Sequence, residues 1–213
     1  MAFMLQLYRK YKYVRYLLLL LYAYFFWLML RITLQYIPFN AMASFLQIKQ
    51  TEVNEVPYYL PVFYTHVYSS MFCLLAGFTQ FNNSLRKRSV MLHRTMGFIY
   101  LASVLGFSAP SGFVMGLHAN GGLLAMLLFV LLALLWWWVT FSAVVAIKQK
   151  NIARHEAFMI RSFALALSAI TLRLWKVVLV YLFAPAPMDV YVLVAGLGWI
   201  PNLLIAEYII KRK

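Results

Sequence analysis

The 213-residue chain has few charged residues, only five carboxylates and a single cysteine. Charged residues make up 11% of the chain, against roughly a quarter in an ordinary soluble domain. Such a chain could not cover a water-exposed surface. The lone Cys73 excludes a disulfide framework and a cysteine-based metal site. Nucleotide-binding motifs, catalytic-nucleophile motifs and internal repeats are also missing, so whether the chain is an enzyme stays open.

Apolar residues dominate instead: they make up 65% of the chain, and the mean hydropathy is +0.80. The apolar runs cover roughly residues 14–36, 62–81, 94–115, 119–147, 157–183 and 189–210. Each is long enough to cross a hydrocarbon core of about 30 Å as a helix. The first is too long for a signal-peptide core and is expected to be retained. The sequence therefore predicts an all-α, polytopic membrane helical bundle of about six transmembrane helices, with residues 1–213 as a single integral membrane domain.

The net charge of +14 comes from lysines and arginines that cluster at alternate joints between the runs. Fourteen of the nineteen lie before run one, between runs two and three, between runs four and five, or after run six. Lys49 is the only one at the opposite joints. The positive-inside rule predicts a multi-pass cell-membrane protein with both termini cytoplasmic. This pattern gives the lipid bilayer as the partner and argues against nucleic acid.

The joint at 37–61 is longer and more polar than the others, with Glu52 and Glu55 and three prolines. Its middle, residues 45–48, is expected to lie along the membrane surface as a short amphipathic helix. Within the spans, Arg161 and Glu207 fall at similar depth near the inner side and are predicted to form a buried structural ion pair rather than a catalytic one. Lys176 is expected to reach outward to lipid phosphates.

Four histidines lie close to the ends of successive spans. His66 and His118 fall at the outer ends of spans two and four, and His93 and His155 at the inner ends of spans three and five. This arrangement fits two bis-histidine haem b sites, because facing helices can supply an axial nitrogen to each side of an iron. A simple metal site and purely structural histidines remain alternatives.

Two arginines inside the spans join the histidines as candidate cofactor-binding residues. Arg173 follows His155 by eighteen residues, which is five whole helical turns, so the two are predicted to share one helix face. Arg161 is the other. Basic side chains near the histidines would pair with haem propionates.

Three stretches differ from generic membrane sequence: they are His93-Arg94-x-x-Gly97-x-x-Tyr100; His155-x-x-x-Met159-x-Arg161-Ser162-x-Ala164 with Thr171-Leu172-Arg173; and Trp199-x-Pro201-Asn202-Leu203-x-x-Ala206-Glu207. Together they resemble an uncharacterised family of bacterial predicted inner-membrane proteins. The resemblance covers spans two to six and implies the bacterial inner membrane, but it supplies no established activity. Span one and the 37–61 segment lie outside it.

More distantly, the order of the four histidines is similar to that of the six-helix di-haem transmembrane cytochrome b proteins. That resemblance implies an outer haem on His66 and His118, an inner haem on His93 and His155, and electron transfer across the membrane. The histidines here lie nearer the helix ends, and the intervals around His93 are short. The leading hypothesis is a haem protein in electron transport. The alternatives are a non-enzymatic subunit that docks on or stabilises other membrane subunits, and a small transporter or lipid-modifying enzyme acting on an anionic substrate.

Overall fold

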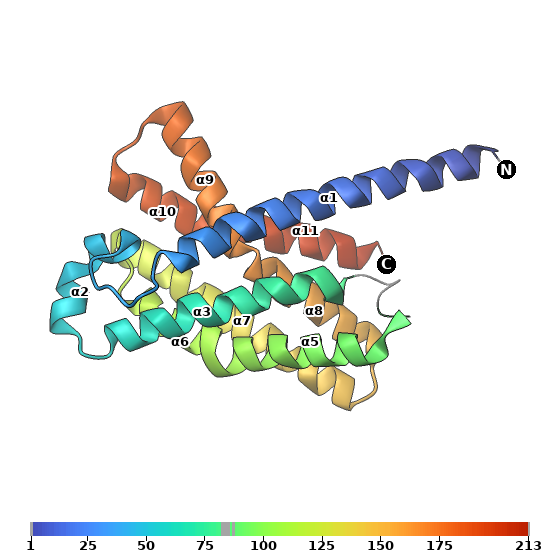
Figure 1. Cartoon of the computed structure of the whole chain (residues 1–213), viewed down its shortest axis with the longest axis horizontal. Helices are drawn as coiled ribbons and strands as arrows, with labels where there is room; N and C mark the ends of the chain where they lie inside the picture. The colour runs from blue at the N-terminus through green and yellow to red at the C-terminus, as the bar shows by residue number, and fades with distance from the viewer. Residues whose placement is uncertain (1, 82–85, 87, 213) are drawn as a thin grey trace.

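The computed structural model describes residues 2–81, 86 and 88–212, and it is a bundle of helices (Figure 1). No strand occurs within those ranges. The α-helices are α1 (Ala2–Leu34), α2 (Gln50–Glu55), α3 (Tyr59–Gln80), α5 (Val90–Ala102), α6 (Ala109–Leu117), α7 (Gly122–Lys148), α8 (Ile152–Ala166), α9 (Ser168–Phe183), α10 (Pro187–Leu197) and α11 (Ile200–Lys211). The predicted fold class is confirmed.

Five continuous or interrupted helices are long and apolar enough to cross a membrane. They cover Tyr16–Leu34, Val90–Leu117, Gly122–Lys148, Ile152–Phe183 and Met188–Lys211. The remaining predicted span corresponds to α3, whose 22 residues extend about 33 Å, enough to cross. It is not among the five, and its polar residues His66, Ser69 and Gln80 bond to neighbouring helices.

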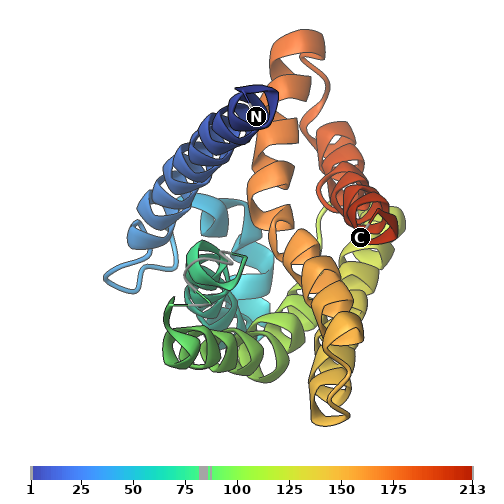
Figure 2. The same ribbon diagram turned by 90° about the vertical axis from the view of Figure 1, so that its right-hand side faces the viewer.

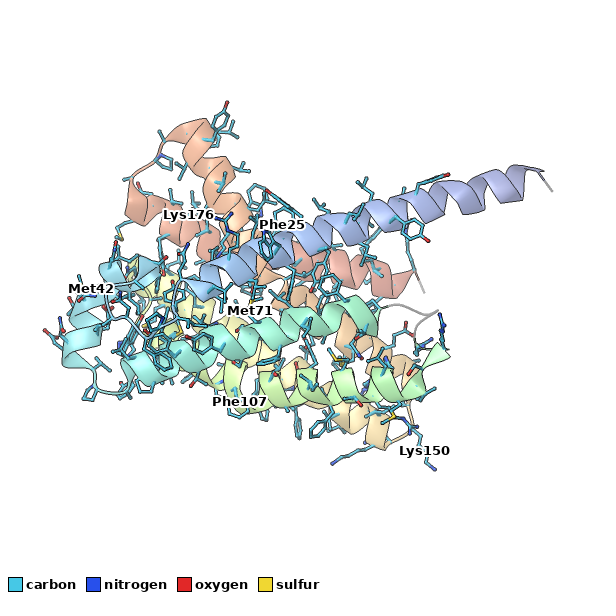
Figure 3. All side chains as sticks on the ribbon, in the orientation of Figure 1. Phe25, Met42, Met71, Phe107, Lys150 and Lys176 are labelled. Atoms are coloured by element: carbon cyan, nitrogen blue, oxygen red, sulfur yellow. The ribbon has the colours of Figure 1, made fainter. Side chains whose placement is uncertain are left out.

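The joints fall at two opposite ends of the bundle. Both termini lie at one end in Figure 1, and Figure 3 shows Lys150 toward that same end. We call this the inner end; the start of α5 after Ser89 also lies there (Figure 1). The outer end holds residues 35–58, 118–121 and 184–186. The structure thus gathers the basic joints on one side, as the charge pattern predicts, although Lys87 and Lys213 lie outside the described residues.

The compact part of the bundle is built around α7, which packs along α6 and α8. Its buried face contains Ala133, Ala143 and Ala146, and small side chains let membrane helices approach closely. By contrast, α1 lies at the edge of the bundle, where it packs mainly on α3 and α9 and touches α8 through Tyr22 and Phe163. Figure 2 shows α1 and α9 spreading away from the compact part and from each other.

Three spans change helical geometry about halfway along their length. A π-helix, Ser103–Ser108, joins α5 to α6; Leu167 divides α8 from α9; and Gly198 and Trp199 divide α10 from α11. Both α6 and α11 restart with a proline, Pro110 and Pro201, in the first turn. Proline lacks the N–H that a helix interior requires, which explains why these two interruptions occur where they do.

The breaks at Leu167 and Gly198 lie side by side and are closed by one amide. Asn202 Nδ2 donates to the Ala164 carbonyl at 3.2 Å and to Thr171 Oγ1 at 2.9 Å. A Cβ on Gly198 would lie 2.9 Å from a carbonyl of α10 and 3.0 Å from a side chain of α9, so only glycine permits this approach. Carbonyls freed by the breaks are therefore engaged within the bundle, as membrane depth requires.

The segment before α3 folds onto the outer end of the bundle, and a short helix does occur at the expected residues 45–48. Its 3-10 helix, Ser44–Lys49, buries Leu46 completely against the end of α1 and the start of α3. Leu46 belongs to a buried cluster that includes Tyr36 and Phe63, and burial of its apolar side chain there stabilises this packing.

Candidate functional site

Two of the four histidines belong to the first turns of neighbouring helices at the inner end. Ser89 caps α5 by accepting a backbone N–H three residues on at 3.2 Å, and Asn151 caps α8 in the same way at 3.0 Å. Such side chains favour helix starts because they satisfy otherwise unpaired N–H groups. His93 and His155 each follow their cap by four residues. The caps therefore set both imidazoles at the same end of the bundle.

The backbone of α7 orients the imidazole of His155. Its Nδ1 lies 2.9 Å from the carbonyl oxygen of Ala143. Because a carbonyl only accepts, Nδ1 carries the proton and Nε2 keeps its lone pair. Histidines that bind metals commonly donate their second N–H in this way. The pattern of residue types gave no sign of this carbonyl.

His93 is the partner that the structure brings to His155. The two imidazoles lie close enough for their charges to interact. His93 Nδ1 is buried and has no hydrogen-bond partner in the described part of the chain. Gln80 Nε2 donates to the His93 carbonyl at 3.0 Å, which ties the end of α3 to the start of α5. The two histidines of the predicted inner pair thus lie at the same end of the bundle within electrostatic range of each other, and His93 Nδ1 has no partner among the described residues.

Hydrogen bonds between Tyr100, Trp136, Thr140 and Ser162, which we call the polar clasp, join α5, α7 and α8 two turns from the histidines. Ser162 Oγ lies 2.7 Å from the Tyr100 oxygen and 2.6 Å from Thr140 Oγ1. Trp136 Nε1 donates to the Tyr100 oxygen at 3.4 Å, and Thr140 Oγ1 donates to the Trp136 carbonyl at 2.6 Å. All four residues are buried. The clasp holds together the three helices that supply the histidines and the Ala143 carbonyl.

The predicted outer pair is not brought together. His66 Nδ1 lies 2.9 Å from the Ser108 carbonyl, halfway up α3 toward the outer end. His118 follows α6, with its ring centroid 5.8 Å from that of Tyr59 and its Nε2 3.4 Å from the Tyr58 hydroxyl. Tyr59 precedes His66 by seven residues, so about 10 Å along the helix separates the two histidines. One iron could not accept both imidazoles in this arrangement.

The predicted ion pair between Arg161 and Glu207 is confirmed. The guanidinium is bidentate, with Nε 2.5 Å from Oε1 and Nη2 2.8 Å from Oε2. The pair is less buried than expected, since the Glu207 side chain is 37% exposed. Because the carboxylate occupies the fork of the guanidinium, Arg161 serves to join α8 to α11.

Arg173 and His155 lie eighteen residues apart on the Ile152–Phe183 span. The break at Leu167 interrupts the helix between them, so counting whole turns does not relate their faces. Arg173 is instead within electrostatic range of His66 and Tyr36. Its Nη1 donates to the carbonyl of Ala169 on its own helix at 2.5 Å.

The sequence did not predict that a lysine at the outer end is buried and holds several polar groups together. Lys49 is 1% exposed, and its Nζ lies 2.5 Å from Glu52 Oε1 and from Asn120 Oδ1 and also donates to the His118 carbonyl. Partial burial is the largest single influence and raises the pKa of the Glu52 carboxyl, but the hydrogen bond from Lys49, a backbone hydrogen bond and the nearby positive charges together bring that pKa below its usual value. We call Lys49, Glu52, Asn120 and the His118 carbonyl the lysine cluster. The only signal in the sequence was a lone lysine three residues before a glutamate.

Within the described residues, no group of three or more His, Cys, Asp or Glu side chains could hold a metal ion. A family model described as predicted membrane protein (DUF2306) matches residues 63–210, which contain all four histidines. No curated protein and no solved structure matches the chain. The predicted resemblance to an uncharacterised membrane family is confirmed, and the match leaves α1 and most of the outer-end segment outside.

Proposed function

We propose a haem-binding, electron-transferring role for this chain, which belongs to the DUF2306 family of predicted membrane proteins and is an integral membrane protein. The proposal assigns one haem b to the inner end, with His93 and His155 as the axial ligands. It assigns no haem to the outer end, because His66 and His118 lie at different depths. The carrying observation is the buried, unpartnered Nδ1 of His93 beside a histidine whose ring is already oriented.

The chemistry of these donors suits the cofactor. Two neutral imidazoles are the ligand set of many electron-transfer haems, and no carboxylate or thiolate is needed. The Ala143 carbonyl holds the His155 tautomer that leaves Nε2 available. When bound, haem would supply one-electron transfer. Arg86 lies within electrostatic range of His93, and such a cation would pair with a propionate.

In this proposal, the rest of the protein positions the two histidine ligands and excludes water from them. The polar clasp fixes α5, α7 and α8 relative to one another, so the two histidines keep their separation. Every member of the clasp is buried, with Thr140 and Ser162 fully so, and the core cluster beside it includes Leu165 and Val104. A dry layer of this kind raises the influence of nearby charges on a redox centre.

We infer that the inner end faces the cytoplasm of a bacterium with the protein in the inner membrane. The basic joints and both termini gather at that end, as the positive-inside rule requires. Single cysteines placed at Lys150 and at Gln35, with Cys73 replaced, would be labelled by an impermeant reagent from opposite sides. Labelling of both from the same side contradicts the orientation.

A visible absorption spectrum of the purified protein tests the haem proposal directly. We expect a Soret band and, after reduction, the sharp α band of a six-coordinate haem b. His93→Ala and His155→Ala should each lose it, whereas the matched variants His66→Ala and His118→Ala should retain it. A protein without the band after haem supplementation, or a band that survives both inner substitutions, overturns the proposal.

A second candidate is a membrane subunit that docks through α1. Only 11% of the Tyr16–Leu34 span is buried in the chain, and this helix lies outside the family match. Removal of residues 2–34 should then abolish copurification of another membrane protein after gentle extraction. A chain that migrates alone with or without α1 contradicts this role and leaves the haem proposal unaffected.

A further inference from the structure

Helix α9 carries two cations on one face in the outer half of the bundle. Arg173 and Lys176 are three residues apart, so their side chains are neighbours on the helix surface, and both are exposed. Leu167 marks the middle of the Ile152–Phe183 span, and the two residues follow it by about 9 and 14 Å along α9. Like charges this close, at the edge of the hydrocarbon, require an anion.

The chain itself does not supply that anion. Helices α1, α3 and α9 contain no acidic residue, and α10, which packs along α9, carries only Asp189 in its first turn. The salt bridges formed by the described residues are Lys49–Glu52 and Arg161–Glu207, so neither cation of α9 has a carboxylate partner there. Arg173 uses one of its five N–H groups on the Ala169 carbonyl, which leaves the planar fork available.

The backbone around the two cations is open toward the outer end. Near Met29, Leu74 and Ile170, helices α1, α3 and α9 pack together as one cluster. Beyond that contact α1 and α9 diverge (Figure 2), and Figure 3 shows Lys176 where α9 passes α1. Arg173 is within electrostatic range of Tyr36 at the outer end of α1. The cations thus lie on the outer part of the span, where α1 and α9 part (Figure 2).

We propose that Arg173 and Lys176 bind the phosphate of an anionic phospholipid between the outer parts of α1 and α9. The guanidinium fork of Arg173 would hold two phosphate oxygens, and Lys176, one turn nearer the surface, would contribute a point charge. The acyl chains would lie on the apolar surfaces of α1 and α9, which expose Leu34, Val177 and Val180. Arg31, alone in the last turn of α1, is the comparison: it has no second cation on its own helix face.

The test uses the full-length protein in nanodiscs or mild detergent and reads retained lipid by native mass spectrometry, with thermal unfolding alongside. Phosphatidylglycerol should be retained over phosphatidylcholine. Arg173→Gln should weaken retention about tenfold or more, since hydrogen bonds between charged groups are strong. Lys176→Gln should weaken it less. Lys150→Gln, an exposed cation at the inner end, is the matched control and should change nothing.

Three results would overturn the site. One is equal retention of the two lipids; another is equal protection by inorganic phosphate alone, which identifies a free-anion site. The third is loss in Lys150→Gln as large as in Arg173→Gln. Should Arg173→Gln fail to fold, Arg173→Lys keeps the charge without the fork and is expected to fall between the wild type and Lys176→Gln. Haem-free protein serves equally well, so failure here is independent of the haem proposal.

Discussion

The inner and outer ends of the bundle each carry two histidines but organise them differently. At the inner end, His93 and His155 leave the first turns of two helices that both run outward. At the outer end, His66 lies inside α3, while His118 follows α6, a helix that runs in the same direction as α5. The first arrangement matches depths, and the second offsets them by about 10 Å.

Comparison of the two ends shows that an N-cap residue predicts the depth of a nearby histidine better than the boundary of an apolar run does. Ser89 and Asn151 define where two helices begin, and the histidines keep a constant distance from them. At the outer end, residues 37–58 fold over the bundle, and Lys49 takes the carbonyl of His118. His118 is thereby held by the lysine cluster instead of facing a second histidine.

Replacement of the buried lysine should produce the largest difference between the two ends. Lys49→Met leaves Glu52, Asn120 and a carbonyl without their donor, and breaking a buried ion pair costs about 3–5 kcal/mol. Hydrogen exchange should accelerate in residues 44–55 and 118–122 and stay unchanged around His155. Lys150→Met, an exposed lysine at the inner end, is the control. Equal acceleration at both ends would show that the ends are not independent.

Disrupting the polar clasp should destabilise the inner end alone, and by less than Lys49→Met destabilises the outer end. Ser162→Ala removes the hydroxyl between Tyr100 and Thr140, and unsatisfied buried polar groups cost about 1–3 kcal/mol. Thermal unfolding in detergent measures the loss. Ser168→Ala, for which the described structure shows no side-chain hydrogen bond, should be nearly neutral. A clasp variant as stable as this control would mean that helix packing alone positions the histidines.

The second ion pair should contribute less than the lysine cluster because it is more exposed. Glu207→Gln removes the carboxylate from Arg161, whose guanidinium also lies 5.4 Å from the Phe158 ring centre. Partly exposed pairs contribute about 0.2–1 kcal/mol. Chemical unfolding monitored through tryptophan fluorescence checks the value, with Glu55→Gln, an exposed acid at the outer end, as the control. A loss matching that of Lys49→Met contradicts the ranking.

Lowering the pH should destabilise the outer end before the inner end. We expect this to be a smaller effect than those of the Lys49, Ser162 and Glu207 substitutions. Because the folded-state pKa of Glu52 is lowered, its contribution is complete above the usual glutamate value of about 4.3 and is lost as the pH falls through the lowered value. Hydrogen exchange of residues 44–55 should rise in that window. Lys49→Met should abolish this pH dependence; its persistence there would assign the effect to another group.

Several features of the fold and the site followed from residue types and their order. Helices long enough to span were predictable because backbone groups in lipid must bond within their own segment. The Arg161–Glu207 pair was predictable because charges at one depth seek each other. Pro110 and Pro201 indicated interrupted helices. The break at Leu167 carried no such residue, so the sequence did not show that the turn count from His155 to Arg173 crosses an interruption.

By itself, the sequence determined that this protein spans a membrane, which ends carry the basic joints, and that His93 and His155 lie near the starts of helices; it placed His118 at the start of a helix, whereas His118 follows the end of α6. These properties depend on local composition and on transfer of single segments into lipid, so neighbours in space are not required. Only the tertiary structure decided that Ala143 faces His155, that Lys49 is buried, and that His66 and His118 lie apart. Each depends on how far one helix slides or rotates against another, and side-chain packing between segments sets that displacement.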